Sequence, residues 1–162
     1  MDIIKIEEVY YPQIVAIYLE GMATGKATFQ TSASNWSEWD KSHLQHSRLA
    51  AFEANKCVGW AALSPVSSRC VYAGVAEVSI YIANKHQGKG IGKILFSELI
   101  SESEKNNLWT LQSSIFPENI SSIKLHLSSG FRQIGYKERI GKLNGVWIDN
   151  IIMERRSKIV GI

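Results

Sequence analysis

A short glycine-rich segment, Gln87 to Gly92 (QGKGIG), carries the strongest chemical signal in the sequence. Glycine lets the backbone approach a ligand closely, and the first N–H groups of a following helix have no partner inside that helix. Those N–H groups lie at the positive end of the helix dipole and bind anions such as phosphate. The glycine spacing differs from the phosphate loop of nucleotide hydrolases and from the G-x-G-x-x-G turn of dinucleotide-binding proteins. The segment predicts a phosphate-binding turn of another kind, with an ordinary strand-to-helix connection as the alternative.

Glu77 is the second candidate, within the strand-like run AEVSIYI. Alternation along a strand places Glu77, Ser79 and Tyr81 on one face. A carboxylate among apolar neighbours is costly to bury without a purpose. A carboxylate can remove a proton from an amine, directly or through a water molecule, so Glu77 is a candidate general base. A structural carboxylate bonded to neighbouring N–H groups is the alternative.

The segments around these residues predict a strand, a tight turn and a helix. The alternating run ends before the glycines, and apolar residues at Ile91, Leu95 and Leu99 then recur at helical spacing. Other strands are expected at 2–6, 48–54, 57–64, from about 72 to 82, 109–116, 131–140 and 146–155, and helices at 12–22, 35–46, 91–104 and 120–129. The order β α α β β β α β α β β predicts an α/β mixed sheet with helices on both faces.

Turn residues support these boundaries. Asn55-Lys56 separates two strand-like runs, and Asn144-Gly145 separates the last two, as in β-hairpins. Gly130 stands where a helix ends with a left-handed residue. Trp36 and Trp39 share a helix face, and we expect them to pack in the core. The alternative places Phe29 and Trp36 at the mouth of a substrate pocket.

Composition limits the class of protein. The chain has 162 residues, 45% of them hydrophobic and 20% charged, which is typical of one folded domain. We expect a single domain over residues 1–157 and a loose tail at 158–162. A net charge of +3 and the absence of long apolar runs argue against nucleic-acid and membrane partners. Cys57 and Cys70 predict two buried thiols in a reducing compartment, so we expect a cytoplasmic protein with no bound metal.

Several segments of the chain resemble one known family. The run Gln87–Gly92 fits Q/R-x-x-G-x-G/A, the pyrophosphate loop of the GNAT superfamily of acetyl-CoA-dependent N-acetyltransferases. Further segments resemble the phosphinothricin acetyltransferase branch: TFQT at 28–31, GWAALSPVSSR at 59–69, VYAGVAEVSIYI at 71–82, IFPEN at 115–119, LHLSSGFRQIG at 125–135 and GVWID at 145–149. The resemblance covers nearly the whole chain. It implies the GNAT fold and acetylation of the α-amine of small amino-acid-like compounds, such as phosphinothricin and methionine sulfoximine or sulfone.

The resemblance implies acetyl-CoA as the acetyl donor. The expected donor-binding residues are Ile80, Tyr81, Ile82, Gln87, Gly88, Lys89, Gly90, Ile91, Gly92, Lys93 and Asn119. Backbone amides of the turn would hold the pyrophosphate, and the pantetheine arm would pair with the strand like an added strand. A backbone N–H near Ile82 would polarise the thioester carbonyl. Lys89 and Lys93 could equally be solvated surface residues, and Asn119 could be a plain N-cap.

The resemblance also implies roles for residues at the reacting centre. Glu77 aligns with the proposed base of the family. His126 occupies, in N-I-S-S-I-K-L-H-L-S-S-G-F, a slot that many GNAT enzymes fill with a tyrosine acting as the acid toward the thiolate. Acid, base, thiolate hydrogen bond and structural roles all remain open for this histidine. Arg69 matches the substrate-loop arginine and offers bidentate geometry to a carboxylate, with Tyr72 and Phe29 completing the pocket.

Three hypotheses of function follow. The first is acetylation of a small amino-acid-like amine. The second keeps the donor but changes the acceptor to another amino acid, a polyamine or a protein N-terminus. The third is a non-catalytic CoA-binding domain, against which the presence of both Glu77 and His126 argues. Related enzymes are homodimers, so we expect a homodimer in which Trp147 and Asp149 brace the last strand or a partner subunit.

Overall fold

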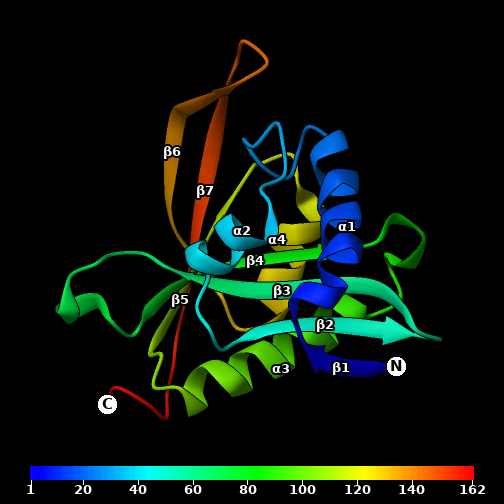
Figure 1. Ribbon diagram of the computed structural model, residues 1–162. Coiled ribbons are helices and arrows are strands. Elements are labelled where there is room, and N and C mark those ends of the chain that lie inside the picture. Colours follow the sequence, from blue (N-terminus) through cyan, green and yellow to red (C-terminus); the bar gives the residue numbers. More distant parts are fainter.

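The computed structural model describes residues 1–162 and contains one seven-stranded sheet with the order β1-β2-β3-β4-β5-β7-β6 (Figure 1). Neighbouring strands run antiparallel except β4 and β5, which are parallel. The strands are β1 (Asp2–Lys5), β2 (Arg48–Glu53), β3 (Lys56–Pro65), β4 (Val75–Ile82), β5 (Thr110–Ile115), β6 (Arg132–Leu143) and β7 (Val146–Arg156).

Helices cover both faces of this sheet. They are α1 (Tyr11–Ala23), α2 (Trp36–Ser42), α3 (Ile91–Lys105) and α4 (Ile120–Ser128), with short 3-10 turns at Glu8–Tyr10, Cys70–Tyr72 and Asn84–His86. α1 and α2 pack on one face, whereas α3 and α4 pack on the other. The expected mixed α/β fold and the expected order of elements are confirmed.

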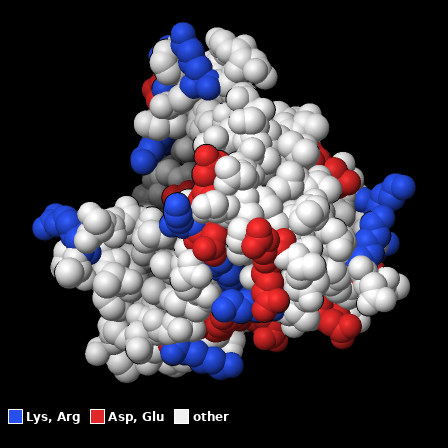
Figure 2. Space-filling model, viewed as in Figure 1, with Lys and Arg blue, Asp and Glu red and all other residues white.

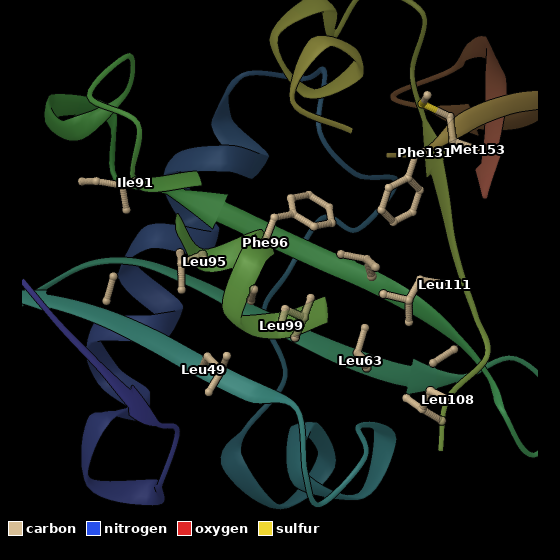
Figure 3. Close-up of a cluster of buried hydrophobic side chains, with 14 of the residues drawn as sticks. Leu49, Leu63, Ile91, Leu95, Phe96, Leu99, Leu108, Leu111, Phe131 and Met153 are labelled. Atoms are coloured by element: carbon tan, nitrogen blue, oxygen red, sulfur yellow. The ribbon is translucent and has the colours of Figure 1, made fainter. Parts of the chain in front are cut away.

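Each face has its own hydrophobic core, because strand alternation sends neighbouring side chains to opposite sides. Leu63 of β3 joins the core under α3, together with Phe96, Phe131 and Met153 (Figure 3). Trp60, three residues earlier in the same strand, lies in the core under α1 and α2. The second core also contains Trp39, which is buried and stacks on Trp36 at a ring-centroid distance of 5.7 Å. The prediction of core packing is confirmed for Trp39, whereas Trp36 is half-buried and packs against this core.

β4 and β5 diverge in the middle of the sheet. They are registered only over three residue pairs, from Val75–Thr110 to Glu77–Gln112. β4 continues to Ile82 and stays paired there with β3, while β5 turns toward β7. One edge of β4 beyond Glu77 is therefore open, and a molecule with hydrogen-bonding groups along its length can pair with it.

Two turn predictions have different outcomes. Asn144 and Gly145 both have positive φ, 49° and 80°, and form the expected hairpin turn between β6 and β7. In the β2–β3 hairpin the turn residues are Ala54 and Asn55, with φ of 46° and 65°, one residue earlier than expected. Two positive φ angles in succession match the right-handed twist of the paired strands, and asparagine suits this conformation well.

Two further predictions are wrong in detail. The chain does not become extended at Tyr72, because Cys70–Tyr72 forms a 3-10 turn and β4 begins at Val75. Cys70 lies on this turn and is exposed, so only Cys57 is a buried thiol. Burial raises the pKa of the Cys57 thiol to about 11.

The second helix is shorter than expected. Asn35 caps it by accepting a hydrogen bond from the Glu38 N–H, but the chain becomes extended at His43. Arg48 explains the early end, because its buried guanidinium takes up carbonyl groups that a longer helix would use. It donates to the carbonyls of His43 and Leu44 and pairs with Asp40 at 2.5 Å.

The periphery is less regular. The terminal segment after Arg156 has no regular secondary structure, and the Arg156 guanidinium donates to the carbonyls of Ser157 and Val160. No helix has the length and apolar character required to cross a membrane. Basic and acidic side chains are intermingled on the face shown in Figure 2, and this face is hollowed near the base of the β6–β7 hairpin.

Candidate active site

A cleft of about 1540 Å³ lies where β4 and β5 diverge. One side of it, the glycine-turn side, is lined by Ile80–Ile82, by the glycine-rich turn and by the start of α4. The other side, the aromatic side, is formed by α1, the 24–34 loop and the sheet face below them. Aromatic residues line this second side: Tyr18, Phe29, Trp39, Trp60 and Tyr81.

The glycines of the turn are required for backbone conformation. Gly88 and Gly90 have φ of +73° and +81°, and a Cβ at either position would meet nothing within 4 Å. Gly90 caps α3 without a side-chain hydrogen bond, so the first N–H groups of α3 stay available to a ligand. Gly92 is required for packing instead, because a Cβ there would lie 2.9 Å from Cδ2 of Leu125, where α4 packs against α3. The turn is thus a preformed anion site at the N-terminus of a long helix.

The other predicted donor-binding residues surround this turn. Gln87 braces it by donating from Nε2 to the Ile82 carbonyl and to Asn84 Oδ1, both at 3.3 Å. Asn119 lines the cleft and caps α4 by accepting from the Ser122 N–H at 3.3 Å, so its N-cap role is confirmed. All of the predicted set lines the cleft except Lys89, which is exposed beside it.

Glu77 lies at the junction of the two sides of the cleft. It is the last β4 residue registered with β5, and its side chain lies on the sheet face that carries Ser79 and Tyr81. More than a third of its surface is exposed. Partial burial nevertheless raises the pKa of the Glu77 carboxyl, and the nearby charge of Lys137 opposes this rise. A carboxylate with a raised pKa is suited to accept a proton near neutrality.

His126 is buried, with 2% of its surface exposed, and both ring nitrogens have partners. Nδ1 donates to the Ser122 carbonyl at 2.7 Å, because a carbonyl can only accept. Nε2 lies 2.8 Å from Ser113 Oγ and accepts from this hydroxyl in the neutral ring. Burial lowers the pKa of His126, which favours that neutral form, and the ring packs between Phe96 and Phe131.

The predicted substrate residues do not come together in this chain. Phe29 lines the cleft and packs edge-on against Phe116 at 4.7 Å. Arg69 and Tyr72 lie outside the cleft lining, on the exposed β3–β4 loop that projects from the body of the protein (Figure 1). There the Arg69 guanidinium lies 5.5 Å from the centre of the Tyr72 ring. Their substrate role stays a prediction.

Sequence reasoning missed several residues of the cleft. Trp60 comes beside Tyr81 only through the β3–β4 register and stacks on it at 5.1 Å. Ser113 of β5 is relevant to the site because its hydroxyl hydrogen-bonds to His126 of α4. Asn150 lines the cleft from β7, beyond the last residue pair with β5. No local sequence signal could have found these residues, because tertiary pairing brings them to the site.

The fold and site agree with the match of residues 17–152 to the family described as Acetyltransferase (GNAT) domain. This chain belongs to that family. It is thus an acetyl-CoA-dependent N-acetyltransferase, as the glycine turn and the open edge of β4 lead us to expect.

Individual relatives indicate the branch. The chain is 30% identical over 152 residues to phosphinothricin N-acetyltransferase of Alcaligenes faecalis. This match covers 89% of this chain and 76% of that protein. It is 30% identical over 137 residues to the L-methionine sulfoximine/L-methionine sulfone acetyltransferase of Salmonella typhimurium, covering 76% of this chain and 79% of that one. A phosphinothricin acetyltransferase from Sinorhizobium meliloti, solved in complex with acetyl-CoA, superimposes with a TM-score of 0.87 at 25% identity over 99% of this chain and 90% of that one.

Proposed function

We propose that this enzyme acetylates the α-amino group of a small amino-acid-like substrate of the phosphinothricin and methionine sulfoximine or sulfone class. The observation that carries the proposal is the position of Glu77, between the glycine-turn side and the aromatic side of one continuous cleft. The names of the relatives support the same class of acceptor. In this arrangement acetyl-CoA binds on the glycine-turn side and the amine enters from the aromatic side.

The donor site follows from the open edge of β4 and the turn after it. The pyrophosphate binds the backbone N–H groups of Gly88 to Lys93, at the start of α3. The pantetheine arm pairs with the free edge of Ile80–Ile82, and Asn119 hydrogen-bonds one of its amides. A backbone N–H near Ile82 then donates to the thioester carbonyl and stabilises the negative charge that develops on its oxygen.

The transfer step requires a neutral amine. Glu77 accepts a proton from the ammonium group, directly or through a water molecule, which frees the nitrogen lone pair. The nitrogen attacks the thioester carbon, so an N–C bond forms and the C–S bond breaks. The electron pair of the C–S bond leaves on sulfur. The nitrogen loses its second proton as the amide forms, and this loss balances the proton that the thiolate takes up.

The hydrogen bonds of His126 constrain its part in that last step. In the neutral ring Nε2 has no proton to give, because it accepts from Ser113 Oγ. We assign His126 a positioning role, in which Nε2 accepts the hydrogen of the Ser113 hydroxyl and fixes the orientation of this cleft-lining group. Of the roles that are open to this histidine, its hydrogen bonds support positioning rather than proton donation.

A homodimer is part of the proposal. The β6–β7 hairpin projects from the body of the protein (Figure 1) and exposes large apolar side chains. Tyr136, Ile140, Val146 and Trp147 each expose about half of their surface or more. Exposed apolar groups gathered on one element mark an interaction surface. A second copy on this hairpin could also bring its β3–β4 loop, with Arg69 and Tyr72, toward the cleft.

The test is a free-thiol release assay with acetyl-CoA and a panel of amines. The panel contains L-phosphinothricin, L-methionine sulfoximine, L-methionine sulfone, common amino acids, spermidine and a short peptide with a free N-terminus. We expect the first three to give the highest kcat/KM. Preferential acetylation of spermidine or of the peptide would refute the proposed acceptor class while leaving the family assignment intact.

A further inference from the structure

Asn150 carries a buried polar atom that no other feature of the site explains. The residue is 9% exposed, lines the cleft from β7, and its Oδ1 has no hydrogen-bond partner. A buried carbonyl oxygen without a partner destabilises a protein, because it has lost its hydrogen bonds to water and gained none in return. An amide that lines a cleft recovers this energy when a bound molecule supplies the missing donor.

The sheet register places Asn150 on the same face as Glu77. Glu77 is opposite Gln112 of β5, and Gln112 is opposite Glu154 of β7. Residues opposite one another in a sheet share a face, and so do residues separated by an even number along one strand. Asn150 lies four residues before Glu154, so its amide projects on the side of the sheet where the Glu77 carboxylate meets the amine.

Lys137 is the β6 residue directly opposite Asn150. It therefore projects on this same face, where it is exposed and has no acidic side chain within ion-pair distance, although it is not one of the residues that line the cleft. Its charge is close enough to Glu77 to oppose the rise in the pKa of that carboxyl. A cation without a partner thus lies next to an amide without a partner, beside the proposed base.

We propose that Asn150 and Lys137 form the subsite for the α-amino-carboxylate end of the acceptor. An asparagine side chain offers one acceptor and two donors, and an amino acid offers an amine beside a carboxylate. Asn150 Oδ1 accepts from the amine, Asn150 Nδ2 donates to the carboxylate, and Lys137 neutralises it. This inference rests on the proposed function and names the residues that select an amino acid over a simple amine.

The subsite gives Arg69 a different role from the one first expected. Arg69 and Lys137 both lie outside the residues that line the cleft, but Lys137 is close enough to Glu77 to affect the pKa of its carboxyl, whereas Arg69 lies on the projecting β3–β4 loop. If the loop of a second copy brings its Arg69 to the cleft, that arginine would bind the distal oxygens of the acceptor. The roles of Lys137 and Arg69 can therefore be distinguished with acceptors that differ only at the α-carboxyl.

The experiment compares L-methionine sulfone with its α-carboxamide, which keeps the amine and removes the negative charge. The variants are Lys137→Met, Asn150→Leu and Arg69→Ala, with Lys142→Met as the matched control. Lys142 is an exposed lysine of the same strand whose ammonium lies over the Trp147 ring at 4.7 Å. Thiol release gives kcat and KM, titration of each acceptor into the CoA complex gives Kd, and thermal melting checks folding.

We expect the parent to prefer the carboxylate and Lys137→Met to reduce this preference about tenfold, the equivalent of about 1.4 kcal/mol. Asn150→Leu should raise KM and Kd for both acceptors, and neither variant should change KM for acetyl-CoA. An unchanged preference in Lys137→Met, or a preference lost in Arg69→Ala instead, would overturn the subsite. Absence of turnover with both acceptors, while CoA still binds, would overturn the proposed acceptor class and the subsite with it. If Asn150→Leu fails to fold, exposed Lys137 still decides the question.

Discussion

Replacing Gly90 by alanine tests whether the glycine turn is held by backbone conformation. Gly90 has φ of +81° and ψ of 0°, and a Cβ there would contact nothing within 4 Å. The variant therefore introduces no clash, and its whole effect is the left-handed conformation, which costs a residue with a Cβ about 1–2 kcal/mol. The strain appears as lower stability if the turn keeps its shape. It appears as weaker CoA binding if the turn relaxes and its N–H groups move away from the pyrophosphate.

Gly135→Ala is the matched control, because Gly135 lacks a positive φ and also has open space around its Cβ position. Both variants reduce the entropy of the unfolded chain equally, so their difference isolates the strain. We expect the losses in the free energy of unfolding and in the free energy of CoA binding to add up to about 1–2 kcal/mol more in Gly90→Ala than in Gly135→Ala. The free energy of unfolding and the Kd for CoA together measure this total, which corresponds to about 5–30-fold if it falls on Kd alone. Equal stability and equal CoA affinity of the two variants would refute the role assigned to the turn.

Two further substitutions test the reacting centre. Glu77→Gln should lower kcat near neutral pH by about 10²–10⁴-fold and shift the rate profile to higher pH, because only the free amine then reacts; a profile identical to the parent would exclude Glu77 as the base. The same variant should be more stable than the parent at pH 7, because the folded-state pKa of Glu77 is raised and ionisation therefore destabilises the fold. That advantage should vanish in thermal melts below about pH 4, where the carboxyl is protonated in both states. His126→Ala should lower the free energy of unfolding by about 2–5 kcal/mol, because it empties a space between Phe96 and Phe131 and leaves Ser113 unpaired. An unchanged melting temperature with loss of the basic limb of the pH profile would identify the imidazole as the proton donor instead.

The sequence predicts those parts of the protein that depend on local order. The glycine turn, the N-cap at Asn119 and the left-handed Gly130 each follow from residues close together in the chain, and all three are found. The end of α2 could not be predicted, because buried Arg48 from a neighbouring strand takes up the carbonyls of His43 and Leu44.

The acceptor side of the cleft is harder to predict for the same reason. Trp60 meets Tyr81, and Asn150 meets Lys137, only through strand register. The family pattern identifies Arg69, but the fold of the chain does not bring this residue to the cleft. A sequence motif identifies residue types at positions along the chain, whereas the composition of the pocket depends on which strands become neighbours in the fold.

The short pairing between β4 and β5 divides the sheet into a four-stranded part, β1 to β4, and a three-stranded part, β5, β7 and β6. The four-stranded part, with α3, carries the proposed donor site, which binds through main-chain groups and the glycine turn. The three-stranded part presents Asn150 and Lys137, and neither residue belongs to the strand or the turn of the proposed donor site. A scaffold divided in this way can acquire new amines as substrates while its thioester specificity stays constant.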